Sequence, residues 1–499
     1  MNNEEDIKFE NYIKGEAKLN SEKQYIIESS CRFNANNDNF KRHYDENKIL
    51  EIHLNNMVFE QDLSFDNVKK LSLIIDDNVK FQKLYIFGCN ELSLRINGRV
   101  KIIDKISINN CKFKQISINN HIDGNIEFQN CEFNDFNLYG FSNATIKGTF
   151  TFDFCEVKEK VNFMNFEFEN KVSFKMSKFK DNVYFNNSVF KDYADFHECE
   201  FEKIACFYGV RFDKTPNFSQ AIFKGNLNAV NTNLNFTFDD LQERIKQEYT
   251  SYETQRTAKE AGVIPNLYQE KSLDKFANDF RDSFRTFKNA LIKDNNALDA
   301  SNFHKCELYC KEIELKNKKY KTLKDKMDKW QLFFYRKLCD HHTDILQSLN
   351  SLILVIGIFV ILSIAMVVDF NYSLGYKPIL EHWYFSLDFY NHHINSIIQD
   401  NYLFVATVNL VMLFGYLILV GFALCLKYMR EFFIIISYVI TLLVLAISPK
   451  ILIPAMGIFT DKRAMLDPLS VLGGIYTIIF GFVAFSFIKT IRKNSIVPS

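Results

Sequence analysis

Phenylalanine recurs in the first half of the chain at a spacing that alternates strictly between five and six residues. In rows of eleven from residue 161, the sequence reads VNFMNFEFENK, VSFKMSKFKDN, VYFNNSVFKDY, ADFHECEFEKI, ACFYGVRFDKT and PNFSQAIFKGN. A fixed period of this kind indicates a repeat architecture, in which each repeat buries its apolar face against the next. This Phe ladder occupies twelve positions: Phe163, Phe168, Phe174, Phe179, Phe185, Phe190, Phe196, Phe201, Phe207, Phe212, Phe218 and Phe223.

An 11-residue period also occurs in right-handed helical coiled coils, so that alternative has to be excluded. On a helix, at about 100° per residue, Phe163 and Phe168 would lie roughly 140° apart and could not share one buried seam. Two positions before each Phe the chain carries a small or apolar residue, which faces the same way as the Phe in a strand. The polar residues between them suit exposed turns. The ladder therefore predicts short stacked strands with Phe inside.

Residues 161–225 resemble pentapeptide-repeat proteins, in particular the form with a central Phe and alternating spacing. The resemblance implies a right-handed quadrilateral β-helix, a four-sided parallel solenoid in which two 11-mers make one coil. Some soluble members of the family bind DNA gyrase by imitating the acidic surface of DNA. Residues 161–225 contain nine Lys or Arg and nine Asp or Glu, so this function is not implied and no nucleic-acid partner is expected.

The pattern loosens upstream without disappearing. Alternating segments such as LEIHL (50–54), KLSLII (70–75) and ELSLRI (91–96) are separated by Asn, Asp and Gly. We therefore expect the β-helix to span residues 48–235, with less regular coils before residue 160. Residues 1–47 are predicted to form an N-terminal cap or a flexible lead, because an open terminal coil exposes unpaired strand edges.

After residue 235 the composition shifts to Lys, Glu, Gln and Ala, which predicts a helical neck over residues 236–344. We expect one helix at 239–260, a break at 262–266 and then an antiparallel helical hairpin with its turn at 294–296. The stretch 284–307 resembles the helical segment that follows the repeats in membrane-bound members of the same family. The apolar seam of the hairpin is predicted to consist of Phe276, Phe280, Phe284, Phe287, Leu291, Ala297, Ala300, Phe303, Cys310 and Ile313.

The end of the neck is basic and aromatic. Residues 316–337 contain nine Lys or Arg against two Asp. One interpretation is a solvated helix face beside a membrane. The other is a contact with membrane lipids, specifically with anionic headgroups. Trp330, Phe333, Phe334 and Tyr335 fit an aromatic belt at the membrane interface.

Residues 345–494 are predicted to form a four-helix transmembrane domain, followed by a short tail at 495–499. The criterion is a run of about 20 apolar residues. The closing stretch 466–494 resembles the end of pentapeptide-repeat proteins that carry an ion-channel-like membrane region. The predicted spans are 345–368, 402–426, 432–453 and 468–488.

Basic residues predict the orientation of the spans. The neck, the KYMRE loop (427–431) and the tail KTIRKN (489–494) would share the cytoplasmic side, whereas the 369–401 loop carries a single Lys or Arg. The acidic start MNNEED predicts no cleavable signal peptide. The eleven scattered cysteines favour free thiols over a disulfide framework. We expect a multi-pass protein of the bacterial inner (cytoplasmic) membrane with both termini in the cytoplasm.

Sequence motifs for catalysis are absent: there is no Gly-rich phosphate loop, H-E-x-x-H, G-x-S-x-G or C-x-x-C. We therefore expect no enzyme, no cofactor and no metal. A metal site in the neck is the alternative to packed thiols, and a divalent-metal or pH-sensing site in the 369–401 loop is the alternative to a solvated loop. The candidate ligands are His304, Cys306 and Cys310 in the neck, and Glu381, His382, Asp388, His392 and His393 in the 369–401 loop.

Two functions follow as hypotheses. The first is a membrane-anchored scaffold or sensor, whose rigid solenoid presents a binding face to an unknown cytoplasmic protein. The alternative is an oligomeric ion channel or pore, assembled as a homo-oligomer and gated by the β-helix domain. Strongly polar side chains are scarce in the spans, and Asn409 and Thr441 are the candidates for lining such a pore.

Overall fold

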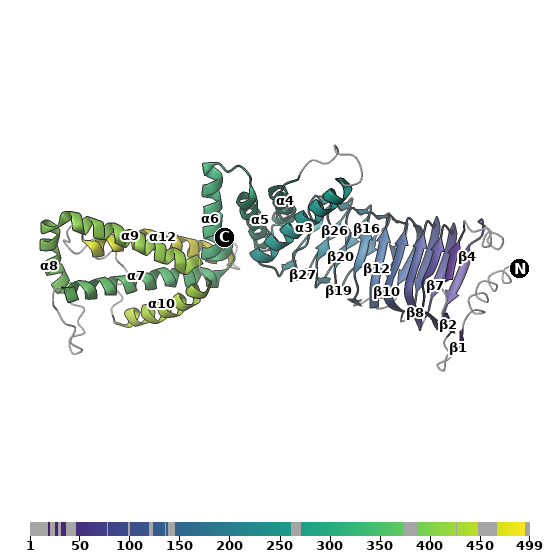
Figure 1. The fold of residues 1–499 in the computed structure, drawn as a ribbon, viewed down its shortest axis with the longest axis horizontal. Coiled ribbons are helices and arrows are strands. Elements are labelled where there is room, and N and C mark those ends of the chain that lie inside the picture. The colour runs from purple at the N-terminus through teal and green to yellow at the C-terminus, as the bar shows by residue number, and fades with distance from the viewer. Residues whose placement is uncertain are drawn as a thin grey trace. The chain divides into compact units, whose positions relative to one another are not determined.

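The computed structural model describes residues 18–19, 25–27, 31–35, 46–76, 78–97, 100–118, 123–134, 136–137, 145–260, 271–373, 387–425, 427–447 and 467–494. The chain forms two compact units, Met1–Lys321 and Thr322–Ser499. A parallel β-solenoid and three helices make up the first unit, and helices make up the second (Figure 1). The predicted neck therefore contributes helices to both units.

Upstream of residue 145 the solenoid is built from two sheets with mostly parallel pairing. Strands here reach up to ten residues, and their inward residues alternate with outward ones, as in the buried–exposed pattern of LEIHL. Two strands from the predicted cap, β2 and β3, pair in parallel with β5 and β6. The strands are β1 Lys18–Leu19, β2 Tyr25–Ile27, β3 Cys31–Asn34, β4 Leu50–Leu54, β5 Met57–Phe59, β6 Leu63–Asp66, β7 Lys70–Ile75, β8 Val79–Phe87, β9 Glu91–Ile96, β10 Val100–Asn109, β11 Lys112–Ile118, β12 Asp123–Gln129, β13 Glu132–Phe133 and β14 Phe136–Asn137.

From residue 145 two further sheets appear, and most strands shrink to two residues. Each coil then places one short strand in each of four parallel sheets, and Phe179 pairs with Phe201, its equivalent in the next coil. This confirms the parallel solenoid that the Phe ladder predicts. The strands are β15 Thr145–Ile146, β16 Phe150–Asp153, β17 Glu156–Val157, β18 Val161–Asn162, β19 Glu167–Phe168, β20 Val172–Ser173, β21 Lys178–Phe179, β22 Val183–Tyr184, β23 Val189–Phe190, β24 Ala194–Asp195, β25 Glu200–Phe201, β26 Ala205–Cys206, β27 Arg211–Phe212, β28 Ile222–Phe223, β29 Leu227–Asn228 and β30 Asn233–Leu234.

The ladder phenylalanines stack along the solenoid axis. Phe185 is fully buried, and its ring centroid lies 5.1 Å from that of Phe163 and 5.0 Å from that of Phe207, with nearly parallel planes. These distances are within the range of favourable aromatic stacking. Eleven ladder residues are buried and Phe223, in the last coils, is half-buried. The four columns are Phe163–Phe185–Phe207, Phe168–Phe190–Phe212, Phe174–Phe196–Phe218 and Phe179–Phe201–Phe223.

Small polar side chains line the core beside the rings. Ser177 Oγ donates to the carbonyl of Phe152 at 2.7 Å, and Cys199 Sγ donates to the carbonyl of Phe174 at 2.7 Å. Such bonds satisfy main-chain acceptors that the tight coil leaves inside. All eleven cysteines are free thiols and nine of them are buried, as their scatter in the sequence predicts.

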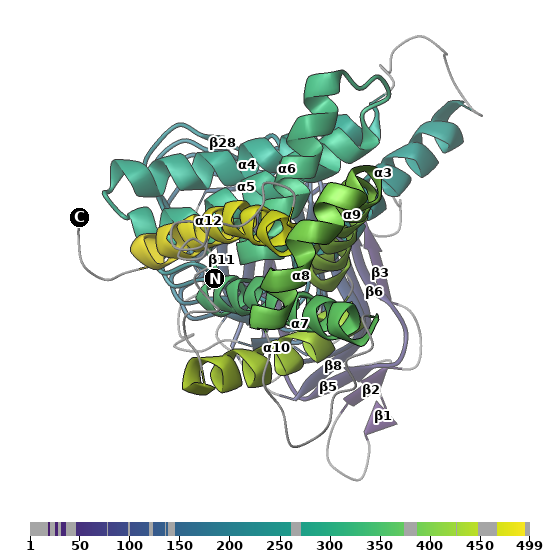
Figure 2. The same cartoon turned by 90° about the vertical axis from the view of Figure 1, so that its left-hand side faces the viewer.

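Three helices complete the first unit: α3 Phe238–Glu260, α4 Leu273–Lys293 and α5 Ala297–Asn317. Helices α4 and α5 lie side by side (Figure 2), joined by a short turn in which Asn295 adopts positive φ. Phe287 of α4 places its ring centroid 4.7 Å from Phe218, and Phe303 of α5 stacks on Phe287 at 5.1 Å. The hairpin thus extends the aromatic core and covers its last rings. The predicted break at 262–266 lies outside the described residues.

The second unit consists of α6 Leu323–Cys339, a short 3₁₀ turn Asp340–His342, α7 Ile345–Ser373, α8 Leu387–Asp400, α9 Tyr402–Cys425, α10 Lys427–Ile447 and α12 Pro468–Asn494. Helix α7 packs against both α10 and α12. A Cβ at Gly357 of α7 would lie 2.2 Å from Ser437 Oγ of α10, so these helices approach closely because Gly has no side chain. Helix α8 occupies part of the segment that the sequence suggested as an external loop.

Three helices within the described residues are long and apolar enough to cross a membrane: Ile345–Phe370, Tyr402–Cys425 and Pro468–Lys493. Stretches of 18 residues within them have mean hydropathies of 3.1, 2.4 and 2.2. They correspond to the first, second and fourth predicted spans. The third, 432–453, is described as far as the end of α10, and its last residues lie outside the described part of the chain.

Replacing a mid-ladder ring should test the stacked core. Phe185→Ala is expected to lower the free energy of unfolding of the 1–321 unit by about 3–5 kcal/mol, because it leaves a cavity between two rings. Lys214→Ala, which removes an exposed ion pair with Asp192, should change it by less than about 1 kcal/mol. Urea unfolding followed by circular dichroism measures both. Equal losses in the two variants would contradict the stacked core.

Candidate functional site

One corner of the solenoid repeats a left-handed backbone conformation in successive coils. Backbone hydrogen bonds connect these residues to neighbouring coils: the amide of Phe154 donates to the carbonyl of Lys175 at 2.9 Å, and that of Met176 to the carbonyl of His197 at 2.8 Å. We call this set the corner column. Its members, all with φ between 52° and 70°, are Asn67, Gly88, Asn110, Asn130, Phe154, Met176, Glu198 and Gln220.

The residue types in the corner column change halfway along the solenoid. Asn and Gly, which tolerate this conformation, give way to Phe154 and Met176 and then to Glu and Gln. Other side chains cost about 1–2 kcal/mol per residue there. A second left-handed column in the same coils keeps Asn or Gly throughout, at Asn165, Asn187, Gly209 and Asn231.

Phe154 and Met176 are also exposed, with 54% and 37% of their surface accessible. The second column shows that Asn or Gly can form this type of corner. The fold therefore does not need Phe or Met at these positions, either for the backbone conformation or for the core. Backbone strain that the fold does not require gathers at functional sites. The C-terminal half of the corner column, from Phe154 to Gln220, is therefore a candidate binding edge.

A polar cluster lies where helix α3 packs on the solenoid beside β24. Tyr193 Oη donates to Glu248 of α3 at 2.7 Å, and Arg244 of α3 pairs with the same carboxylate. The Arg244 guanidinium also lies over the Tyr193 ring. Asp195 is buried next to this group and accepts from the amide of His197 at 2.9 Å. These contacts fix α3 to the solenoid through charged groups.

Two ionisable groups of this cluster have shifted pKa values. Burial, and then the charge of Glu248, raise the pKa of Asp195 to about 7. Burial lowers the pKa of His197, whose Nδ1 lies 2.7 Å from Ser219 Oγ. Near neutral pH, Asp195 is therefore only partly ionised, and His197 favours its neutral form. Perturbed, buried ionisable groups mark functional sites more often than average, although structural networks perturb them too.

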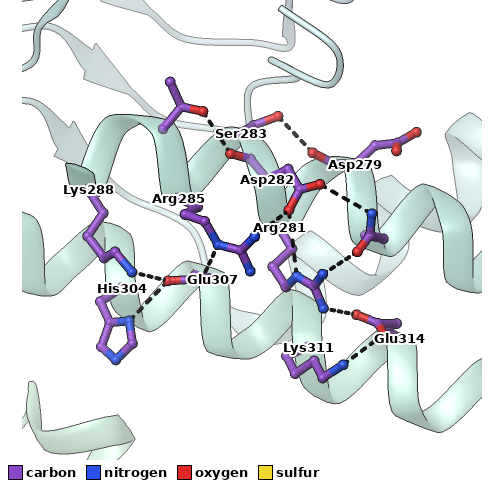
Figure 3. A network of polar contacts seen from close by, with 12 residues as sticks. Asp279, Arg281, Asp282, Ser283, Arg285, Lys288, His304, Glu307, Lys311 and Glu314 are labelled. Atoms are coloured by element: carbon purple, nitrogen blue, oxygen red, sulfur yellow. Dashed lines mark hydrogen bonds and ion pairs between the residues drawn. The ribbon is translucent and has the colours of Figure 1, made fainter. Parts of the chain in front are cut away.

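A second network joins helices α4 and α5 (Figure 3). Glu307 of α5 accepts from Arg285 Nε at 2.9 Å and from Lys288 Nζ at 2.7 Å, both on α4, and from His304 Nδ1 at 3.1 Å. Burial alone raises the pKa of Glu307, but these three donors outweigh it and hold its pKa well below the ordinary range. Arg281 and Lys311 pair with Glu314 in the same way (Figure 3). Every carboxylate named here has cationic partners, so the network stabilises the hairpin and offers no free acid or base.

The metal candidates from the sequence do not converge in the described residues. His304 bonds Glu307, whereas Cys306 and Cys310 are buried in the first unit's core. Within the described part of the chain, no three His, Cys, Asp or Glu side chains are placed to hold a metal ion. In the second candidate, Asp388, His392 and His393 lie in α8, and Glu381 and His382 lie outside the described residues.

The pore candidates Asn409 and Thr441 lie on α9 and α10, and both are buried. Thr441 shares one side of α10 with Ser437, one helical turn away, and Ser437 is the residue that faces Gly357. Among the described contacts, the hydroxyls of Ser437 and Thr441 have no hydrogen-bond partner.

Two features of the candidate site escaped the sequence analysis. In the regular coils the left-handed positions recur every eleven residues from Phe154 to Asn231, and Asn or Gly occupies every second one, a pattern that resembles ordinary turn polarity. The Asp195–Glu248 cluster has no sequence signal, since the two carboxylates come from distant, unrelated segments.

Comparison with known proteins identifies no relative: no family, curated protein or solved structure matches the chain.

Placing Asn at the exposed apolar positions of the corner column should stabilise the solenoid. We expect Phe154→Asn and Met176→Asn each to raise the free energy of unfolding of the 1–321 unit by about 0.5–1 kcal/mol, because Asn tolerates positive φ. Asn165→Ala, at the matched position of the second column, should lower it by about 1 kcal/mol. Urea midpoints measure all three. A loss of stability in Phe154→Asn would mean that the ring serves the fold.

The Asp195 carboxyl should make stability depend on pH. Between its unfolded pKa of about 3.9 and its folded pKa of about 7, only the folded state holds the proton, so its contribution to stability falls as pH rises. Asp195→Asn removes this dependence while keeping an acceptor for His197. We expect the variant to match the wild type at pH 4 and to exceed it by about 2–4 kcal/mol at pH 8.

Asp181→Asn is the control for this measurement. Lys203 lowers the pKa of Asp181, so that residue titrates below the window of interest. Its replacement should leave the slope of stability between pH 5 and 8 unchanged. Parallel pH curves for the wild type and Asp195→Asn would contradict the shifted pKa.

Proposed function

We propose that this protein is a membrane-anchored scaffold or sensor of the pentapeptide-repeat type. Its solenoid would present a rigid binding edge to a cytoplasmic protein. The observation that carries the proposal is the corner column, where exposed apolar side chains occupy positive-φ positions of a kind that Asn and Gly hold throughout the second column. No catalytic role is part of the proposal.

The assignment to pentapeptide repeats rests on the regular part of the solenoid. Coils made of two 11-mers with central Phe, and four parallel sheets, support a right-handed quadrilateral β-helix. The proposal extends that architecture to the two-sheet coils upstream, which share sheets with the regular part.

The membrane anchorage rests on the three apolar helices. We propose α10, continued to residue 453, as a fourth span. Both termini would then be cytoplasmic, in a bacterial inner membrane. The gathering of basic residues near the ends of α6 and α12 supports this orientation.

A protein partner suits the solenoid better than nucleic acid. Lysines on its surface pair with carboxylates of neighbouring coils, for example Lys178 with Glu200 at 3.1 Å and Lys105 with Glu127 at 3.1 Å. A surface with alternating charge provides neither the cationic stripe that binds phosphates nor the acidic surface that imitates them. The apolar pair Phe154 and Met176 matches the contacts that protein interfaces favour.

Site-specific photo-crosslinking in the native cell tests the binding edge. A photoreactive phenylalanine analogue is placed at position 154 or 176 of the full-length protein, and at the exposed position 165 of the second column as matched control. We expect one adduct of the same size at 154 and 176 and none at 165. Adducts of equal yield at all three positions, or none at any, would reject the edge.

A pore is the second candidate, and one observation favours it. The hydroxyls of Ser437 and Thr441 are buried without a partner among the described contacts, and polar groups buried within membrane helices are often functional. Purified protein in liposomes with an imposed ion gradient separates the candidates. Downhill flux that is lost in Asn409→Leu supports a pore, and absence of flux supports the scaffold.

A further inference from the structure

Helix α6 carries an apolar stripe that the rest of the second unit leaves exposed. Leu323, Met327 and Trp330 recur at helical spacing, with 79%, 70% and 67% of their surface accessible, and Phe334 continues the stripe. The helix is firmly started: Thr322 and Asp325 form a reciprocal capping box. A well-formed helix with one uncovered apolar face requires something to cover that face.

Basic side chains flank the stripe. At about 100° per residue, Lys324 and Lys326 fall on opposite borders of it. Lys329, Arg336 and Lys337 add positive charge. Of the two aspartates of α6, Asp325 is engaged in the cap, and Asp328 falls on the side of the helix away from the stripe. An apolar face bordered by lysines is the pattern of helices that lie in a membrane interface, where the lysine stems follow the apolar surface and the ammonium groups reach the phosphates.

The position of α6 within the second unit fits that pattern. Residues 340–342, all with positive φ, turn the chain between α6 and α7, and Figure 1 shows α6 running across the direction of α7, α9 and α12. The Phe334 ring lies 5.7 Å from Phe482, a partly exposed residue of the apolar helix α12. The stripe therefore continues onto the surface that α12 would present to lipid.

The same end of the helical bundle collects cations. Lys493 Nζ at the end of α12 lies 3.4 Å from the carbonyl of His341, next to the end of α6. Arg430 of α10 lies 3.5 Å from the carbonyl of Gln347 in the first turns of α7. This end thus combines the features of a membrane boundary that faces anionic headgroups.

We propose that α6 is an interfacial helix bound to the anionic phospholipid surface of the membrane that α7, α9 and α12 cross. Its apolar stripe enters the boundary between headgroups and acyl chains, and its lysines contact lipid phosphates. The proposal rests on the proposed membrane anchorage and names the lipid class that the basic segment recognises. It is independent of the protein partner at the corner column.

Fluorescence of Trp330 in the full-length protein tests the proposal. The chain has two tryptophans, so Trp383→Phe leaves Trp330 as the reporter, and the double variant Trp330→Phe/Trp383→Phe supplies the background. In bilayers with about one third phosphatidylglycerol, we expect a blue-shifted emission, weak quenching by acrylamide and roughly two-fold quenching by lipids brominated near the headgroup. Strong acrylamide quenching would show a solvated helix, and protection from both quenchers a protein-covered one. Either result overturns the proposal.

Charge and apolar variants separate the two parts of the interaction. Lys324→Gln/Lys326→Gln/Lys329→Gln should make bromolipid quenching of Trp330 equal in anionic and neutral bilayers, whereas Lys203→Gln/Lys214→Gln/Lys224→Gln on the solenoid should not change it. Leu323→Gln/Met327→Gln should reduce the quenching in both bilayers. An unchanged signal in the α6 variants would contradict the assignment. Failure of crosslinking at residues 154 and 176 leaves these results unaffected, so the two proposals fail separately.

Discussion

The stacking of each coil's phenylalanine rings on those of the next is the interaction on which the first unit depends. A two-residue strand has too few hydrogen bonds to persist alone, so a coil is stable only when it is covered on both sides. The last coil must therefore be covered by something that is not a coil. Phe287 meets this requirement with a ring from a helix, and Phe303 continues the stack one layer further. Helices and solenoid thus share one core.

The ladder and most of the hairpin seam were predictable because each residue there lies in a local, repeated environment. Ala297, which the seam included, is exposed instead, at the first residue of α5. Phe at every fifth or sixth position predicts the solenoid core, and apolar residues at helical spacing, such as Phe280 and Leu291, predict the buried face of α4. The two-sheet form of the upstream coils was not predictable, since Leu and Ile alternation fits either cross-section. The corner conformations of Phe154 and Met176 run against residue preference, so residue type alone does not predict them. Helix α8 lacked a continuous apolar pattern.

Two of the buried carboxylates in the first unit, those of Glu307 and Asp195, are held in opposite ways. Glu307 has three cationic or polar donors from two helices and is held ionised. For Asp195, burial and then the neighbouring Glu248 carboxylate raise the pKa to about 7. The α4–α5 hairpin is therefore held by a carboxylate with three hydrogen-bond donors. The contact between α3 and the solenoid instead contains Asp195, a carboxyl whose ionisation is disfavoured. Of these two carboxylates, Asp195 is the one with a pKa near neutrality.

The uneven coils have a consequence for how the chain reaches its fold. In a solenoid of identical coils, a segment could pair with the coil next to its proper partner and still form the same ring stacks and strand pairs. Here Phe113 pairs with Phe133, and Phe133 pairs in turn with Val157, so two successive coils differ in length. A misthreaded chain would set long strands against short ones and break the pairing at that point. The irregular N-terminal coils therefore favour one pairing register, and the regular coils that follow inherit that register.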